Sequence, residues 1–291
     1  MLAAVASAAL LAAALGLAAC SGAKSGNTAS TPAKVVPERI IAAPRSLLSA
    51  TGPLANGTMW AVAGNSSIGL FKFNSASGKE TGSVSVSQAA RSVAETPTGV
   101  VAVALGTASS GALDLMHGSA RKAFRTVSLP APALQVVTAS SGTDFYVLTV
   151  WPSSASVSIV SSATGKIVGT VPAPKDSVSV AAAPQQGLVY VLQRNGGVDD
   201  ISIHGGTIES SFSVGDPGES IAVSPDGTRL YVLKGTGTVS NIAVVNAATG
   251  GIIKVLPAPS HCVQLVVSQT GQQLYEVVGS PDYGNIQVFG F

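Results

Sequence analysis

The chain has 291 residues, of which 46% are hydrophobic and only 10% are charged, and its formal net charge is +2. This composition excludes an intrinsically disordered protein and is sufficient for a large buried core. The 32 glycines and 16 prolines favour many short strands separated by turns over long helices. Lys and Arg residues form no stripe with interleaved aromatic residues, so we expect no binding to nucleic acid.

The N-terminal segment carries the strongest localisation signal. Residues 2–19 are almost entirely Ala, Leu, Val and Gly, and they end in Leu17-Ala18-Ala19-Cys20 directly before a polar tract. This sequence resembles the lipobox of bacterial lipoproteins, and the resemblance implies a signal peptide over residues 1–19 and a lipid on Cys20. No Lys or Arg precedes the apolar run, where a secretory signal normally has one; the simplest explanation is that Met1 is not the true start. An uncleaved membrane anchor remains the alternative, and both interpretations predict a domain anchored to the cell membrane on its extracytoplasmic side.

The tract that follows is predicted to be a flexible tether. Residues 20–34 are rich in Ser, Thr, Gly and Ala, and such a composition cannot bury apolar area. A tether of this length reaches roughly 20 Å. With a lipid on Cys20, it would hold the remaining domain, residues 35–291, close to the membrane.

A four-stranded unit repeats along the rest of the chain. Its clearest copy has Pro225-Asp226-Gly227 between two apolar runs, which predicts a β-hairpin, and two further strands follow within about forty residues, the size of one propeller blade. Glycines equivalent to Gly227 recur at intervals of 40 to 45 residues, at Gly57, Gly99, Gly142, Gly187 and Gly271. Five of the six units carry an aromatic residue on the strand after this glycine, which we expect to pack between blades.

The ends of the chain are predicted to complete one blade together. The sixth unit ends at residues 286–289 without a fourth strand, and residues 38–44 resemble the fourth strands that precede Pro172-Ala173-Pro174 and Pro257-Ala258-Pro259. Pairing the first strand with the last leaves only short edges exposed. The fold class we predict is therefore all-β, a β-propeller of six four-stranded blades closed by an N-terminal strand.

One stretch carries a family resemblance. Residues 223–232, Val-Ser-Pro-Asp-Gly-Thr-Arg-Leu-Tyr-Val, followed by Val-Val-Asn-Ala-Ala-Thr-Gly at 244–250, resemble the repeat of YVTN-type bacterial β-propellers. The match is close over residues 219–259, fair over 133–218 and 262–291, and weak in the first two units. The resemblance implies the fold and leaves the function open, because propellers include both binding proteins and enzymes.

Candidate site residues follow from the alternation of turns between the two faces of a propeller. The Pro-Asp-Gly hairpins share one face with His117 and His204, which we interpret as turn residues and not as metal ligands. On the other face, the links between blades carry charged residues near the channel, although loops are also where charge ordinarily occurs. We expect a polar ligand or peptide to bind at Arg45, Arg91, Lys175, Asp176, Glu219 and His261.

Two aromatic residues are candidate partner contacts. Trp151 and Tyr283 lie in loops further from the channel on the same face, where we also expect Arg194 and Lys234. An exposed rigid aromatic side chain is a plausible interface anchor. For Trp151, the equally weighted alternative is that the ring folds back on its own blade.

Catalytic motifs are sparse. The sequence has no His-Glu-x-x-His, no Gly-x-Ser-x-Gly and no phosphate-binding loop, so we predict no catalytic residue, metal or cofactor, and we expect Cys262 to be buried and unpaired. The predicted function is a cell-surface lipoprotein whose propeller binds or scaffolds an unknown protein, peptide or cell-wall ligand. The alternatives are an enzyme of the lactonase or other propeller hydrolase type, with its site at the channel mouth, and a structural partner in a larger envelope complex.

Overall fold

The computed structural model describes residues 36–43, 45–54, 56–64, 68–87, 89–120, 122–184, 187–215, 217–236 and 239–290. The predicted signal peptide, Cys20 and the tether lie outside the described residues. Where the structure describes the chain it is all β, and it contains no helix long and apolar enough to cross a membrane.

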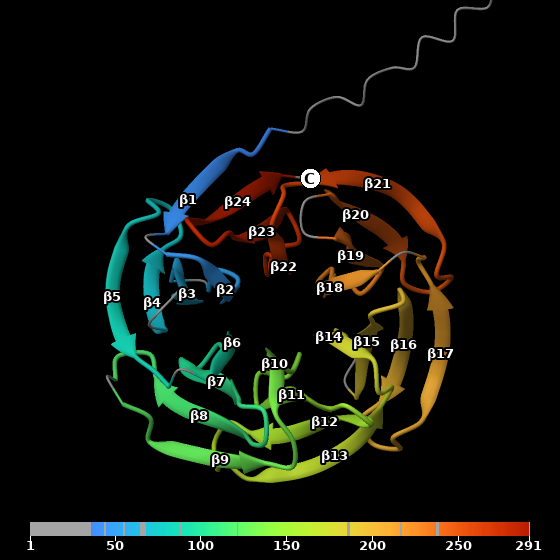
Figure 1. Ribbon diagram of the computed structural model, residues 1–291, viewed down its shortest axis with the longest axis horizontal. Coiled ribbons are helices and arrows are strands. Elements are labelled where there is room, and N and C mark those ends of the chain that lie inside the picture. The colour runs from blue at the N-terminus through green and yellow to red at the C-terminus, as the bar shows by residue number, and fades with distance from the viewer. Residues whose placement is uncertain are drawn as a thin grey trace, which may run out of the picture. The chain divides into compact units, whose positions relative to one another are not determined.

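The described strands form six antiparallel sheets of four strands each, arranged as the blades of a β-propeller around a central channel (Figure 1). In the first three blades the strands are, from the channel outward, β2 (Leu47–Ala50), β3 (Thr58–Ala63), β4 (Gly69–Asn74) and β5 (Glu80–Ser85); β6 (Ala90–Glu95), β7 (Val100–Gly106), β8 (Gly111–His117) and β9 (Arg125–Leu129); β10 (Ala133–Thr138), β11 (Asp144–Trp151), β12 (Ser154–Ser161) and β13 (Ile167–Ala173). In the last three they are β14 (Ser177–Ala182), β15 (Leu188–Gln193), β16 (Gly197–Ser202) and β17 (Ile208–Ser213); β18 (Gly218–Val223), β19 (Arg229–Thr236), β20 (Val239–Asn246) and β21 (Ile252–Ala258); β22 (Cys262–Val267), β23 (Gln273–Gly279), β24 (Gly284–Gly290) and β1 (Arg39–Ala43).

The N-terminal strand closes the ring. Strand β1 pairs with β24 in an antiparallel register that runs from Arg39 opposite Val288 to Ala43 opposite Gly284. The sixth blade is thus built from both ends of the propeller domain. The predicted fold, its six blades and its mode of closure are all confirmed.

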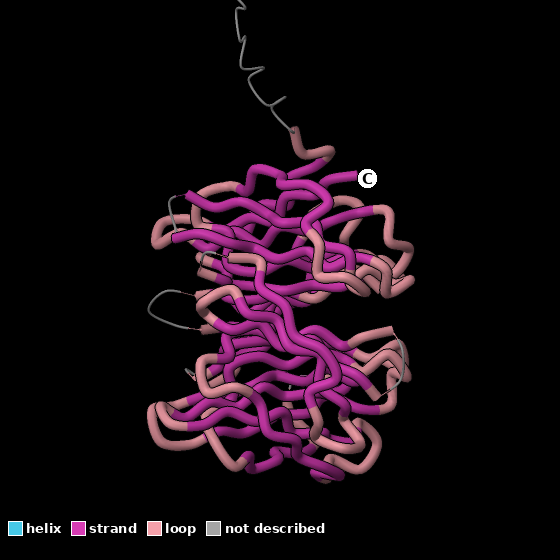
Figure 2. Tube along the Cα trace, turned by 90° about the vertical axis from the view of Figure 1, so that its right-hand side faces the viewer, coloured by secondary structure: helices cyan, strands magenta, loops and turns pink. Residues whose placement is uncertain are grey.

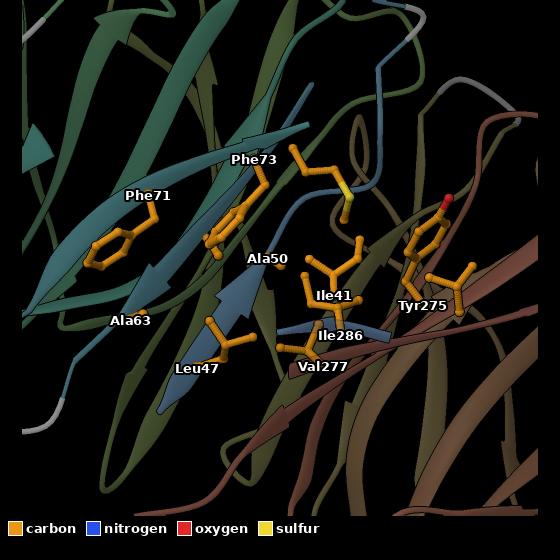
Figure 3. Packing of buried hydrophobic residues seen from close by; sticks show 12 residues of the cluster. Ile41, Leu47, Ala50, Ala63, Phe71, Phe73, Tyr275, Val277 and Ile286 are labelled. Atoms are coloured by element: carbon orange, nitrogen blue, oxygen red, sulfur yellow. The ribbon is translucent and has the colours of Figure 1, made fainter. Parts of the chain in front are cut away.

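The core lies between neighbouring blades and is made of the side chains that point out of each sheet. Figure 3 shows the part where blades 6 and 1 meet, with Ile41 from the closing strand packed among Leu47, Phe73 and Tyr275. The aromatic position predicted for five units is filled by residues that are 1–7% exposed: Trp60, Tyr146, Tyr190, Tyr231 and Tyr275. These rings pack in the core, as expected from the sequence.

Turn chemistry fixes each blade's first hairpin. Gly227 has a φ of 71°, a conformation that side chains with a Cβ rarely adopt. The carboxylate of Asp226 accepts hydrogen bonds from Ser224 and Thr228, and these bonds lower its pKa to about 2. Figure 2 shows the disc from its edge, with loops gathered on its two faces. One face carries these hairpins, and the other, which we call the link face, carries the connections between blades.

Candidate functional site

Each innermost strand carries a β-bulge at the same place, close to the link face. In β2 the register with the second strand skips one residue between Leu47 and Ser49, and the same irregularity recurs in all six blades. A bulge leaves one residue unpaired and redirects its side chain. The residues at the bulges are Leu48, Arg91, Leu134, Val178, Glu219 and Val263.

The residue after each bulge belongs to a closed ring of hydrogen bonds. The channel-side edge of an innermost strand has no further strand to pair with, so its buried N–H groups need other acceptors. In every blade a Ser or Gln side chain of the preceding blade accepts one. The bonds are Val93 N to Ser49 Oγ (3.3 Å), Val136 N to Ser92 Oγ (3.2 Å), Val180 N to Gln135 Oε1 (2.8 Å), Ile221 N to Ser179 Oγ (3.1 Å), Leu265 N to Ser220 Oγ (3.1 Å) and Ala50 N to Gln264 Oε1 (2.8 Å).

This polar ring joins each blade to the next around the whole channel. All six side chains are at most 9% exposed, so each bond satisfies a buried donor and is worth about 1 kcal/mol. The sequence carried a signal for it that our prediction missed. A Ser or Gln followed by an apolar residue recurs in register with the blades.

Above the polar ring lies a cavity of about 360 Å³ that opens on the link face. Its lining consists of the six bulge residues and the six residues of the polar ring, completed by Arg194 and Gly218. Blades three apart face each other across the six-bladed ring, and β6 lies opposite β18 (Figure 1). The bulge residues of these two strands, Arg91 and Glu219, are therefore on opposite sides of the cavity. By the same geometry, Leu48 lies opposite Val178 and Leu134 opposite Val263.

The charged groups of this cavity are held at its rim. Arg91 is exposed, and its Nε donates a hydrogen bond to the carbonyl of Gly106 at 3.4 Å. Arg194 is exposed as well, while its main chain is fixed on both sides: its N–H donates to Asp176 and its carbonyl accepts from Gly218, each at 2.9 Å. Glu219 is half-buried. The cavity therefore combines two guanidinium groups, one carboxylate and four apolar side chains.

Of the six residues predicted at the channel mouth, Arg91 and Glu219 line this cavity, and Arg45, Lys175, Asp176 and His261 do not. The guanidinium of Arg45 lies 5.6 Å from the centroid of the Phe71 ring. His261 has a φ of 61°, and its carbonyl accepts the N–H of Gly279 at 2.9 Å. The main-chain carbonyl of Asp176 likewise accepts a hydrogen bond from the N–H of Arg194.

Arg194 and Lys234 were both expected further from the channel. The structure corrects the placement of Arg194, whereas Lys234, on the second strand β19, does not line the cavity. Arg194 lines the cavity because its main chain is bonded to the link before β14 and to the start of β18. Lys234 is 6% exposed, and its Nζ donates to the carbonyl of Val214 at 2.6 Å. The buried side chain of Lys234 thus links blade 5 to the segment that follows blade 4 and does not reach a ligand site on the surface.

The two candidate partner contacts differ in their surroundings. Trp151 is half-buried, and its Nε1 donates to the carbonyl of Pro130 at 3.3 Å in the link before β10. This contact matches the alternative in which the ring folds back. Tyr283 is 47% exposed in the turn between β23 and β24.

Two further hollows lie away from the link face. The opposite mouth of the channel holds a cavity of about 290 Å³, and a groove of about 660 Å³ runs between blades 3 and 4. The groove is the larger space, but its hydroxyl groups already bond one another: Ser141 Oγ lies 2.8 Å from Thr143 Oγ1, which donates to Asp144 at 2.9 Å. The link-face cavity is therefore the better candidate, because it offers opposite charges around an apolar centre.

The remaining chemistry-bearing groups give no second site. Cys262 is free and 1% exposed, and burial raises the pKa of its thiol, so the thiolate nucleophile is suppressed. His117, the last residue of β8, stacks on Phe124 with a centroid separation of 4.7 Å. In the described ranges, no three His, Cys, Asp or Glu side chains cluster as metal ligands.

Comparison with known proteins supports the fold alone. No family model matches the chain, and no curated protein matches it in sequence. Among solved structures it is similar to hydrazine synthase from Kuenenia stuttgartiensis, with a TM-score of 0.63 and 14% sequence identity over 84% of this chain and 76% of that one. At this identity the likeness shows a shared β-propeller and carries no activity over to this chain.

Proposed function

We propose that the propeller is a binding module that holds a small polar ligand or a short peptide in the link-face cavity. The observation that carries this proposal is the contrast between two neighbouring positions of the repeat. The position after each bulge is always Ser or Gln and serves the scaffold, whereas the bulge position is Leu, Arg, Leu, Val, Glu and Val around the ring. A symmetric position that faces a cavity and varies in chemistry is what a repeat protein uses for recognition.

Binding is supported over catalysis by what the cavity wall contains. Its ionisable side chains, among the described lining residues, are Arg91, Arg194 and Glu219. These groups suit the orientation of a charged ligand, and the His261 that the hydrolase alternative requires does not line the wall. The volume falls at the lower end of the range for small-molecule sites, roughly 300–1,000 Å³.

The first test fills the cavity. Leu134 is 39% exposed in the wall, so Leu134→Trp should block the mouth without disturbing the core. We expect a thermal-shift screen of the full chain against metabolites, short peptides and cell-wall fragments to give hits that stabilise the wild type. A ligand at one hundred times its Kd adds about 2.7 kcal/mol of stability.

The control is Val168→Trp on the outer strand of the same blade, where Val168 is 62% exposed. Hits should be lost in Leu134→Trp and retained in Val168→Trp. Hits that stabilise both variants equally, or a screen without a single hit, would contradict a ligand site in this cavity.

We further propose that the module is attached to the extracytoplasmic side of the cell membrane through a lipid on Cys20. The support is the lipobox-like sequence before Cys20 and the polar tract after it. Two acyl chains on one cysteine are sufficient for stable attachment.

Cys20→Ala is expected to move the protein from the membrane fraction to the soluble fraction or to leave its apolar leader uncleaved. Fractionation of cells together with intact-mass measurement distinguishes these results. A wild-type protein without added lipid mass would refute the anchor.

A further inference from the structure

We infer that the ligand of the link-face cavity is a zwitterionic short peptide of two or three apolar residues, with free amino and carboxyl ends, and this inference rests on the proposed function. Its basis is the opposition of Arg91 and Glu219 across the channel, on the second and fifth blades of six. A guanidinium and a carboxylate on opposite walls complement a molecule with a negative and a positive end. The exposed Arg194 also lines the cavity, and its carbonyl accepts a hydrogen bond from Gly218, the residue before Glu219.

The apolar residues of the cavity lie across this polar axis. Leu48 faces Val178, and Leu134 faces Val263, so both sides of a molecule stretched from Arg91 to Glu219 meet aliphatic surface. Leu134 is 39% exposed in this position. A polyphosphate or a sugar has little apolar surface to bury against these aliphatic side chains, whereas the side chains of an apolar peptide bury apolar area against them.

The floor of the cavity supplies the groups that a peptide bond needs. Gln135 and Gln264 lie on opposite blades and line both the link-face cavity and the cavity of the opposite mouth. Each Oε1 is fixed by a main-chain N–H at 2.8 Å, so each amide is held in one orientation. No hydrogen bond from either Nε2 is present among the described residues. Two oriented N–H donors at the floor suit the carbonyl oxygen of a peptide backbone.

The length of the peptide follows from the separation of its charges. In a single amino acid the amino and carboxyl groups share one carbon atom and cannot reach opposite walls of the channel. Each added residue extends the chain by about 3.3–3.6 Å. A dipeptide or tripeptide places its ends apart while remaining within a cavity of about 360 Å³.

The test uses the full chain in detergent and four matched probes: Leu-Leu, N-acetyl-Leu-Leu, Leu-Leu-amide and N-acetyl-Leu-Leu-amide. Isothermal titration calorimetry is expected to show that Leu-Leu binds on the order of tenfold tighter than either singly blocked peptide, because each block removes one charge-assisted contact. The doubly blocked peptide should bind most weakly. Equal affinities for all four probes would overturn the inference.

Two variants assign each end of the peptide to its wall. Arg91→Gln should make Leu-Leu and Leu-Leu-amide bind equally, and Glu219→Gln should make Leu-Leu and N-acetyl-Leu-Leu bind equally. The matched controls are Lys166→Gln, in an exposed turn on the opposite face, and Glu80→Gln, on an exposed outer strand. Both controls should keep the full preference, and a preference that survives in Arg91→Gln and Glu219→Gln would refute the assignment.

The inference and the proposed function fail separately. If none of the four probes binds while binding of another compound is lost in Leu134→Trp, the inference of a zwitterionic peptide is wrong and the cavity remains a binding site. If no compound of any class is lost in Leu134→Trp, both are wrong.

Discussion

Replacing Glu276 with valine is expected to raise the free energy of unfolding at pH 8 by on the order of 4 kcal/mol. Glu276 lies on β23 and is 3% exposed, and its Oε2 has no hydrogen-bond partner within the described part of the chain. Burial raises its pKa from the ordinary 4.5 to about 8. The equivalent positions of the other five blades, opposite the second residue after each bulge, are Ala61, Val103, Val147, Val191 and Val232.

The direction of the pH dependence follows from this pKa. Below about pH 4.5 the carboxyl is protonated in the folded and in the unfolded chain, and the stability that it contributes is fully present. Between 4.5 and about 8 the unfolded chain releases the proton and the folded chain keeps it, so the free energy of unfolding falls by about 1.4 kcal/mol per pH unit. Above about pH 8 the carboxyl is charged in both states and the loss levels off; the accumulated loss is the cost of holding the charge in the core.

Equilibrium unfolding in urea at pH 5, 7 and 8 measures the effect. Glu276→Val should remove most of this pH dependence and differ from the wild type by no more than about 1 kcal/mol at pH 5, because the smaller side chain also leaves some space. Glu276→Gln should remove the same pH dependence while keeping a buried polar group. Glu80→Gln, at an exposed position, is the control. A pH dependence unchanged in both Glu276 variants would show that this carboxyl titrates normally.

Ile41→Ala is expected to destabilise the protein by about 3 kcal/mol, within the range for truncating a large buried aliphatic side chain. Ile41 is 1% exposed and belongs to the same buried cluster as Leu47 and Phe73 of blade 1, so it is the fully buried apolar side chain that the closing strand contributes to this cluster. Its neighbour Ile40 points outward and is 57% exposed.

The adjacent residue gives the matched control. Ile40→Ala changes the same chemical groups on the same strand and should alter the free energy of unfolding by less than about 0.5 kcal/mol. Chemical denaturation of both variants makes the comparison. Equal effects of the two substitutions would contradict closure of the ring by β1 in the register described.

Much of the fold was predictable because its determinants are local. Gly227 and its counterparts require a positive φ at the same turn in each unit, and Pro225 and Asp226 identify that turn without knowledge of the rest of the chain. Closure was predictable too, since the segment around Ile40 and Ile41 repeats the pattern of the outer strands while the sixth unit lacks one. The resemblance to YVTN-type repeats supported the prediction of the fold and gave no information on the function.

The site was predictable only in part, because β-bulges decide which side chains enter the channel. Arg91 and Glu219 precede the polar-ring residues Ser92 and Ser220. The sequence around each of them does not show that a β-bulge directs its side chain toward the cavity. Asp176 and His261 lie in the same links but contribute main-chain carbonyls. Arg194 was placed too far from the channel since its position depends on bonds to two other segments. Aligning the six units on their recurrent Ser and Gln residues would have revealed the bulge positions.

A crystal structure of the protein with a ligand identified by the screen, or with Leu-Leu, would show directly where the propeller binds. We expect density on the link face, above Gln135 and Gln264 and between Arg91 and Glu219. Density in the groove between blades 3 and 4, or on the outer strands, with the link-face cavity unchanged, would contradict this expectation.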